Sequence, residues 1–206
     1  MERGYRDLGA RAVELIYNAL DPETHHPVAP DPAYWCDLLF IGHRLPDRET
    51  RVREYFLDAA ESCPGYTFIL GGEGWGDAEL PPNVRYVGHV PTSEHNRLNS
   101  SARLVLNVTR QAMAEYGYSP PTRVFEAAGA GACLVTDSWE GVDTFLKPGE
   151  EVLVASSAED MMRHVRFVAE EDAVLIGRRA MARVLSEHTY ERRGEQLQRL
   201  FETAFG

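Results

Sequence analysis

Four short, mostly apolar segments constrain the fold of this chain more than any other feature. Each ends at or just before a glycine or a polar residue, and helical periodicity fills most of the sequence between them. A continuous apolar run of this length is typical of a strand that is covered on both faces, as in a parallel sheet. The four predicted strands are Cys36–Gly42, Tyr66–Leu70, Leu104–Asn107 and Cys133–Thr136.

Predicted helices separate these strands. From about residue 48 to 62, apolar residues such as Val52, Phe56 and Ala59 recur at helical spacing. Strands that alternate with helices in this rhythm form parallel units with right-handed crossovers. We therefore predict an α/β fold, a single Rossmann-like three-layer α/β/α domain with a mainly parallel sheet, which binds ligands at the carboxyl ends of its strands. Further strands are predicted at Val84–Val87 and Glu151–Val154, and further helices at about 92–101, 158–169, 173–185 and 189–204.

The domain organisation follows from length and local composition. With 206 residues the chain is long enough for one core and a small appendage. Residues 1–34 are predicted to be a connector and N-terminal extension, because their second half is rich in proline, histidine and acid. Residues 35–187 are predicted to form the domain and 188–206 a C-terminal helix. That helix carries an apolar stripe that needs a partner, so we predict docking of another chain or a homo-oligomer through Leu197, Leu200, Phe201 and Ala204.

The overall charge restricts the partners. A formal net charge of −11 argues against a nucleic-acid backbone or an anionic membrane, because both need a basic face. A local pocket can still be positive on an acidic protein, and Arg44, Arg48 and Arg123 are candidates for one. No segment is long enough to span a membrane, and the first residues lack the apolar stretch of a signal peptide. We predict no membrane span and a cytoplasmic location.

Cysteine and histidine give no indication of a metal site. The three cysteines are odd in number, and at least two of them fall in apolar, strand-like runs. This pattern predicts reduced, buried thiols, and no Cys-x-x-Cys pair is present for zinc. His25 and His26 are adjacent, which places their side chains on different sides of an extended chain. We predict no metal site and no cofactor.

The segment Ser119–Asp137 predicts a helix start, a helix with small residues on one side, a glycine turn and a strand. Ser119 is expected to cap the helix and Pro120 to occupy its first position, and Gly129 and Gly131 to end it. A helix that starts at the carboxyl edge of a parallel sheet presents unpaired N–H groups and its positive dipole end. The segment therefore predicts a site for an anion such as pyrophosphate, to which Arg123 would add charge.

Glu126 is the one acid on the apolar part of this helix, and two interpretations of it remain open. In the first it is a surface carboxylate or pairs with Arg123 at helical spacing. In the second it accepts hydrogen bonds from two vicinal hydroxyls of a ribose held beside the phosphate site.

The glycine-rich segment Gly71–Gly76 does not predict a dinucleotide fingerprint. Four of its six residues are glycine, but the chain continues into Glu79-Leu-Pro-Pro82 and not into a helix. We interpret it as a loop in which the backbone approaches a ligand or a neighbouring part of the chain.

Taken together, these segments resemble the carboxyl-terminal domain of GT-B glycosyltransferases, and most closely the branch that includes the spore maturation protein CgeB. The similarity covers roughly Asp37 to Phe201. It is carried by Val-Arg-Tyr-Val-Gly-His-Val, Leu-Val-Leu-Asn-Val-Thr, Arg-Val-Phe-Glu-Ala-Ala-Gly-Ala-Gly-Ala-Cys-Leu-Val-Thr-Asp, Leu-Lys-Pro-Gly-Glu-Glu-Val and the closing His-Thr-Tyr-Glu-Arg-Arg. The resemblance implies half of a GT-B fold.

In that family this domain holds the nucleotide-sugar donor, here expected to be a UDP-sugar as substrate. The resemblance implies that Glu126 binds the ribose hydroxyls and that Gly42 and Arg44 close over the phosphates. It implies that the pyrophosphate faces the backbone of Pro121, Thr122 and Arg123. It also implies that the nucleobase lies along Tyr86, Val87, Gly88 and His89.

The chain departs from the family pattern in two respects. Many relatives carry a second glutamate at the position of Tyr118, and Glu115 is offset from it by three residues. A GT-B enzyme also has an amino-terminal domain that supplies the acceptor site, and we expect this chain to need such a domain or a partner chain. Catalytic residues are therefore not assigned.

Three functions remain open at this point. The first is the donor-binding domain of a glycosyltransferase, incomplete as a catalyst by itself. The second is a non-catalytic interaction module that retains the half-fold. The third is a nucleotide-sugar epimerase of similar architecture.

Overall fold

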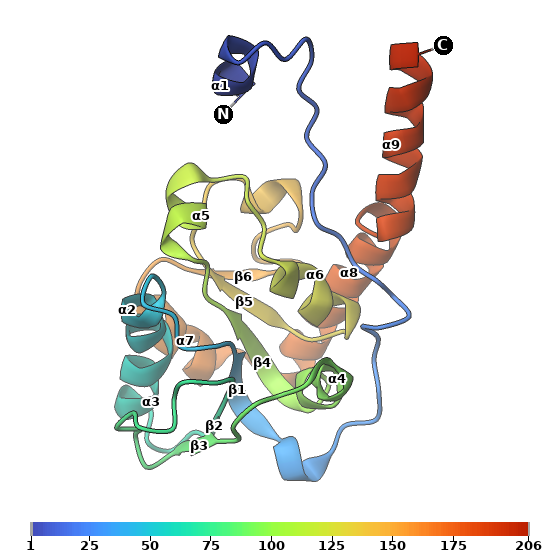
Figure 1. The fold of residues 1–206 in the computed structure, drawn as a ribbon. Coiled ribbons are helices and arrows are strands. Elements are labelled where there is room, and N and C mark those ends of the chain that lie inside the picture. Colours follow the sequence, from blue (N-terminus) through green and yellow to red (C-terminus); the bar gives the residue numbers. More distant parts are fainter. Residues whose placement is uncertain (1, 206) are drawn as a thin grey trace.

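The computed structural model describes residues 2–205 and contains a six-stranded sheet with the strand order β3-β2-β1-β4-β5-β6 (Figure 1). All five strand pairings are parallel. This order reverses between β1 and β4, as in doubly wound nucleotide-binding folds. The predicted Rossmann-like α/β fold is confirmed. The strands are β1 (Cys36–Ile41), β2 (Phe68–Gly71), β3 (Val84–Tyr86), β4 (Ala102–Asn107), β5 (Leu134–Asp137) and β6 (Leu153–Ala155).

Helices cover both faces of the sheet because the central strands are apolar on both sides. In β1, Leu38 and Phe40 belong to one buried cluster, whereas Leu39 and Ile41 belong to the other. Successive strand residues point to opposite faces, so two separate cores form. The first core is closed by α2 (Glu49–Val52), a π-helical turn (Arg53–Leu57), α3 (Asp58–Ser62) and α7 (Ala158–Phe167). The second is closed by α4 (Thr92–Asn99) and α6 (Thr122–Gly129), and α8 (Glu170–Glu187) contributes Ala173 and Ile176 to the first core and Ala180 and Val184 to the second.

Helix α6 begins later than the sequence analysis predicts. Its first residue is Thr122 and Pro121 is its N-cap, so the prediction of Ser119 as cap and Pro120 as first helical residue is wrong. Helical backbone angles are disfavoured for a residue that precedes a proline. Because Pro120 precedes Pro121, this preference acts against a helical Pro120, and the helix starts after both prolines. The end of α6 at Gly129, with Gly131 at φ +74°, is as predicted.

The glycine-rich loop after β2 packs against the backbone that follows β1. Gly72 has φ +118°, and a Cβ there would lie 2.3 Å from the carbonyl oxygen of Gly42. The indole N–H of Trp75 donates to the same oxygen over 2.8 Å. The interpretation of this loop as a close backbone approach is confirmed, and the neighbour is the Gly42 turn. No helix follows the loop before β3.

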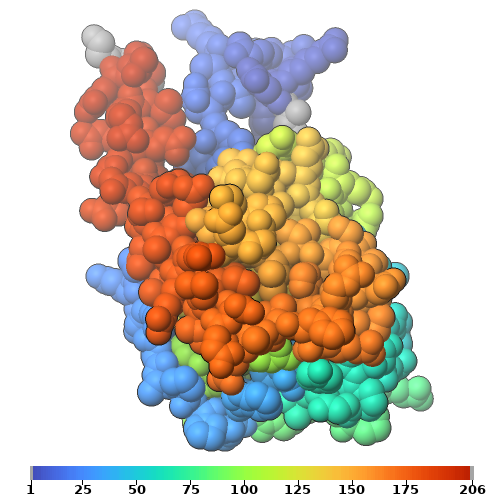
Figure 2. Space-filling view, turned by 180° about the vertical axis from the view of Figure 1, so that it is seen from behind, coloured from blue at the N-terminus to red at the C-terminus, as the bar shows by residue number. Residues whose placement is uncertain are grey.

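The N-terminal segment and the last helix, α9 (Tyr190–Phe205), project from the body side by side (Figures 1 and 2). Gln196 donates to the carbonyl oxygen of Leu15 over 3.1 Å. Closer to the body, Leu20 is fully buried and its N–H donates to the carbonyl oxygen of His188 over 2.7 Å. The segment that follows Leu20 therefore packs on the domain. The remaining helices are short: α1 (Glu2–Asp7), two 3-10 turns at Pro32–Tyr34 and Val142–Thr144, and α5 (Gln111–Tyr116), which the sequence analysis did not predict.

All three cysteines are buried and free, as predicted. Burial raises the pKa of Cys36 and of Cys133 to about 12, so both thiols stay protonated at neutral pH. Among residues 2–205, no helix combines the length and apolar character needed to cross a bilayer.

Candidate functional site

A cleft of about 420 Å³ opens at the carboxyl edge of the sheet. It lies between the ends of β1 and β4, where the strand order reverses and where open α/β sheets bind their ligands. The start of α6 forms another wall. The lining residues include Phe40 and Ile41 of β1 with Gly42 and His43 after it; Leu106 and Asn107 of β4 with Val108 after it; and Thr122, Arg123 and Glu126 of α6 with its N-cap Pro121.

Three guanidinium groups line this cleft, on a protein with a net charge of −11. Arg123 is the most enclosed: its side chain is 15% exposed, and its buried Nη1 has no hydrogen-bond partner. Arg48 donates through Nη2 to the carbonyl oxygen of His43 over 2.7 Å, while its Nε is buried and unpaired. Arg110 is exposed and pairs with Asp47 over 2.7 Å. Burial lowers the pKa of Arg123 and of Arg48, because desolvation penalises the charged form, and Glu126 opposes this shift at Arg123.

The first turn of α6 adds backbone donors to these cations. No side chain caps the helix, and the first N–H groups of any helix lack an intrahelical partner. Thr122 and Arg123, whose N–H groups belong to this turn, both line the cleft. Free amides, the helix dipole and a buried guanidinium together form a strong anion site.

Glu126 is the one carboxylate among the lining residues. Its Oε2 lies 3.7 Å from Nη1 of Arg123, and its Oε1 lies 3.9 Å from Nε2 of His25. The pairing with Arg123 that the sequence allowed is therefore present, but it is too long for a hydrogen bond. The side chain is 22% exposed and forms no hydrogen bond with another described residue. Glu126 thus retains the acceptor capacity that a pair of hydroxyls would use.

Two histidines that the sequence analysis did not place in the site lie beside Glu126. His95, from α4, lines the cleft, and its ring stacks on the ring of His25 at a centroid distance of 6.0 Å. Burial lowers the pKa of His95 to about 4, with Arg123 acting in the same direction and Glu126 opposing it. Burial also lowers the pKa of His25. No local pattern signals this arrangement, because it joins the N-terminal segment, α4 and α6.

The depressed pKa of His95 predicts a loss of stability in mild acid. Between its ordinary value of 6.5 and about 4, the unfolded chain binds a proton that the folded chain does not. The contribution of His95 to the free energy of unfolding is therefore fully present above pH 6.5 and is lost as the pH falls toward 4. We expect a loss of about 1 kcal/mol at pH 5, after allowing for solvent screening of the partly exposed ring. Urea unfolding at pH 7 and pH 5 should show a smaller loss for His95→Gln, and an equal loss would contradict this assignment.

A buried network of polar side chains lies next to the cleft, at the ends of β4 and β5. Asp137, at the end of β5, is fully buried and accepts hydrogen bonds from the N–H and the hydroxyl of Thr109 over 2.9 and 2.8 Å. Arg51 forms an ion pair with its other carboxylate oxygen. Asn107, which lines the cleft, donates to the hydroxyl of Thr136 over 3.0 Å. The position of Asp137 at the end of an apolar strand was the available signal, and the sequence analysis did not use it.

Of the residues predicted to bind the donor, Gly42, Pro121, Thr122, Arg123 and Glu126 line the cleft. The other five lie outside its lining and remain predictions: Arg44, Tyr86, Val87, Gly88 and His89.

Arg44 points toward carboxylates of its own surroundings. It pairs with Glu49 over 2.6 Å and with Asp77 over 3.0 Å, and lies over the ring of Trp75. His89 borders the cleft indirectly, because its ring stacks on His43 at 6.4 Å and His43 lines the cleft.

The segment from Tyr86 to Gly88 is held against the glycine-rich loop. The hydroxyl of Tyr86 donates to the carbonyl oxygen of Gly72 over 2.8 Å, and the carbonyl oxygen of Gly88 accepts from the N–H of Gly72 over 2.7 Å. Residues 2–205 include no group of three or more His, Cys, Asp or Glu side chains placed to hold a metal ion.

Comparison with known proteins gives one family and a set of related folds. The model of a family described as "Glycosyl transferase-like" matches residues 48–199. No curated protein matches the sequence.

Three solved structures illustrate the likeness of the fold. HepE of Anabaena, in complex with UDP-glucose, has a TM-score of 0.72 at 15% identity, over 98% of this chain and 61% of HepE. Sucrose-phosphate synthase of Thermosynechococcus elongatus has a TM-score of 0.73 at 15% identity, over 99% of this chain and 56% of that protein. The C-terminal domain of the Francisella tularensis glycosyl transferase LpcC has a TM-score of 0.62 at 12% identity, over 83% of this chain and 99% of that domain. This chain thus spans about three fifths of the length of HepE.

Proposed function

Because this chain belongs to the glycosyl transferase-like family and has the fold of one half of a GT-B glycosyltransferase, we propose that its cleft binds a nucleoside-diphosphate sugar. The predicted family membership is confirmed at this level, and the narrower CgeB-like branch stays a prediction. The donor we propose is a UDP-sugar, since HepE was crystallised with UDP-glucose and with UDP and glucose. The cytoplasmic location also stays a prediction.

One observation supports this proposal above the others. The cleft at the strand-order reversal contains the uncapped start of α6, the unpaired Nη1 of Arg123 and the unbonded carboxylate of Glu126. The first two suit a pyrophosphate, and the third suits two hydroxyls of a ribose. Arg48 also lines the cleft and would add a second guanidinium for the phosphates. The nucleobase would extend toward the segment from Tyr86 to His89, which borders the cleft through His43.

The same arrangement suits glycosyl transfer. The leaving group of that reaction is a nucleoside diphosphate, on which negative charge increases as the bond to the sugar breaks. Guanidinium groups and helix amides that are already oriented stabilise this charge without reorganisation. The acceptor side of the reaction is assigned to an additional domain or a partner chain, as in two-domain GT-B enzymes, and no catalytic residue is assigned on this chain.

Calorimetry with UDP, UDP-glucose and 2′,3′-dideoxy-UDP tests the role of Glu126. We expect Glu126→Gln to weaken UDP binding about tenfold, because a charged acceptor that holds hydroxyl donors is worth roughly 1.5 kcal/mol. The dideoxy nucleotide lacks those hydroxyls and should bind wild type and variant equally. Equal loss for both nucleotides would contradict the ribose contact. Folded protein that binds no nucleoside diphosphate would contradict the proposed function.

A folded protein that binds no nucleoside diphosphate would favour the alternative function, a non-catalytic module that docks a partner. Leu197 on the projecting helix α9 is 43% exposed, which is consistent with such docking or with self-association. Sedimentation velocity of the wild type and of Leu197→Glu distinguishes the two, since only self-association would make the mass of the wild type depend on concentration.

A further inference from the structure

A second cavity, of about 440 Å³, opens at the opposite, amino edge of the sheet. Its walls come from α8, from the segment around Val28 and from the residues that precede β4 and β5. Figure 2 shows it as a recess between α8 in orange and the blue segment below, with green atoms at its floor. No residue lines both this cavity and the nucleotide cleft. Its volume falls in the range of small-molecule sites.

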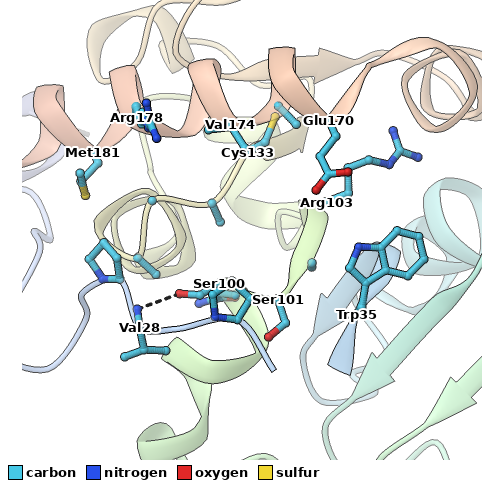
Figure 3. Close-up of a pocket in the computed structure, with 18 residues that line it drawn as sticks. Val28, Trp35, Ser100, Ser101, Arg103, Cys133, Glu170, Val174, Arg178 and Met181 are labelled. Atoms are coloured by element: carbon cyan, nitrogen blue, oxygen red, sulfur yellow. Dashed lines mark hydrogen bonds between the residues drawn. The ribbon is translucent and has the colours of Figure 1, made fainter. Parts of the chain in front are cut away.

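The walls are held in place by hydrogen bonds of the backbone. The N–H of Val28 donates to the hydroxyl of Ser100 over 3.2 Å, as the dashed line in Figure 3 marks. The N–H of Asp31 donates to the hydroxyl of Ser101 over 2.8 Å. The N-terminal segment, which forms one wall of the cavity, is thus tied to the end of α4.

Asn99 is the feature that points to a ligand. It lines the cavity and is fully buried, yet neither its Oδ1 nor its Nδ2 has a hydrogen-bond partner. Asn96, one turn earlier on α4, is also buried but donates to the carbonyl oxygen of Thr24 over 2.9 Å and accepts from the N–H of His26 over 3.3 Å. A buried amide with both groups unpaired is costly, so its presence needs an explanation. One ligand group that both donates and accepts would satisfy it.

The two charged side chains of the cavity that have no ion-pair partner among the described residues carry opposite charges. Glu170 and Arg178, both on α8, line it without an ion pair to another described residue. Figure 3 shows Glu170 directed from the helix into the cavity. Arg103 is already occupied, because it pairs with Asp37 over 2.9 Å and donates to the carbonyl oxygen of Val165. Glu170 and Arg178 are roughly 12 Å apart along the helix. This set suits an elongated, neutral ligand with several donors and acceptors, and not an anion.

Trp35 provides an apolar surface at one end of the cavity, opposite α8 in Figure 3. Its side chain is 49% exposed, and it is the one aromatic residue among the described lining residues. A single exposed indole face suits the C–H face of a sugar ring, whereas a planar base is better held between two parallel walls. We propose that this cavity is a binding site for a short neutral saccharide, which stacks on Trp35 and exchanges hydrogen bonds with Asn99, Glu170 and Arg178.

Titration of ¹⁵N-labelled protein with glucose and maltose tests the proposal. We expect saturable shifts of the Trp35 indole N–H and the Asn99 side-chain amide, with dissociation constants in roughly the millimolar range. The amides from Thr122 to Glu126 should not shift. Trp35→Ala and Asn99→Leu should each weaken binding about tenfold or more. Three results would overturn the site: no saturable shift with either sugar, shifts that survive in both variants, or shifts of Trp35 and Asn99 with uridine alone.

Thermal unfolding separates a ligand role of Asn99 from a structural one. Asn99→Leu removes an amide that has no partner, so its Tm should equal or exceed that of the wild type. The matched change Asn96→Leu breaks the hydrogen bonds of this amide with Thr24 and His26 and should lower the Tm. A fall in Tm for Asn99→Leu as large as that for Asn96→Leu would assign the amide to the fold and contradict the proposal.

Discussion

Replacement of Arg123 by glutamine is expected to weaken UDP binding about 100-fold while the protein stays folded. The guanidinium is 15% exposed, with a buried Nη1 that no described residue satisfies. A phosphate would satisfy it, and a charge-assisted hydrogen bond in such a site is worth about 1.5–3 kcal/mol. Together with the lost Coulomb attraction this gives roughly two orders of magnitude in affinity. Calorimetry with UDP and with uridine measures the effect.

The controls for this prediction separate charge from position. Uridine carries no phosphate and should bind wild type and Arg123→Gln alike. Arg110 lines the same cleft, but its side chain is 56% exposed and already pairs with Asp47. Arg110→Gln should therefore weaken UDP binding far less. UDP affinity unchanged by Arg123→Gln would place the phosphates away from α6 and contradict the proposed function.

Replacement of Asp137 by alanine is expected to lower the free energy of unfolding by about 3–5 kcal/mol. The carboxylate is fully buried, accepts two hydrogen bonds from Thr109 and forms the ion pair with Arg51. Its removal leaves a guanidinium with little access to water and without its anion. Unfolding in urea, followed by circular dichroism, measures the change.

The exposed pair between Arg44 and Asp77 provides a matched control. Asp77 is 84% exposed, and its carboxylate lies 3.0 Å from Nη1 of Arg44. An exposed ion pair contributes at most about 1 kcal/mol, so Asp77→Ala should have a small effect. Similar losses for Asp137→Ala and Asp77→Ala would show that the buried network does not stabilise the fold.

Local patterns in the sequence were sufficient to predict the sheet and one wall of the cleft. The apolar runs around Leu38 and Leu104 predict buried parallel strands, because only a doubly covered strand is apolar on both faces. Arg123 and Glu126 are three residues apart on one helix, so their proximity follows from helical geometry alone. The true start of α6 could also have been predicted from local sequence, since the Pro120-Pro121 pair disfavours a helical Pro120.

The rest of the cleft required the tertiary structure. His25 approaches Glu126 from a part of the chain about one hundred residues away, and Arg51 reaches Asp137 across a similar separation. Arg44 pairs with Glu49 and Asp77 and lies outside the lining of the cleft, so its contact with the phosphates stays a prediction. A single-sequence pattern records the spacing of neighbours along one element and not the pairing of distant side chains.

The sequence by itself thus determined which segments become strands and helices, since burial on one or two faces leaves a periodic pattern. Only the tertiary structure decided which side chains meet at the two edges of the sheet. The unpaired amide of Asn99 shows the difference, because every residue near it is ordinary in the sequence. Whether a buried polar group has a partner depends on packing between distant elements, and packing is a property of the folded chain.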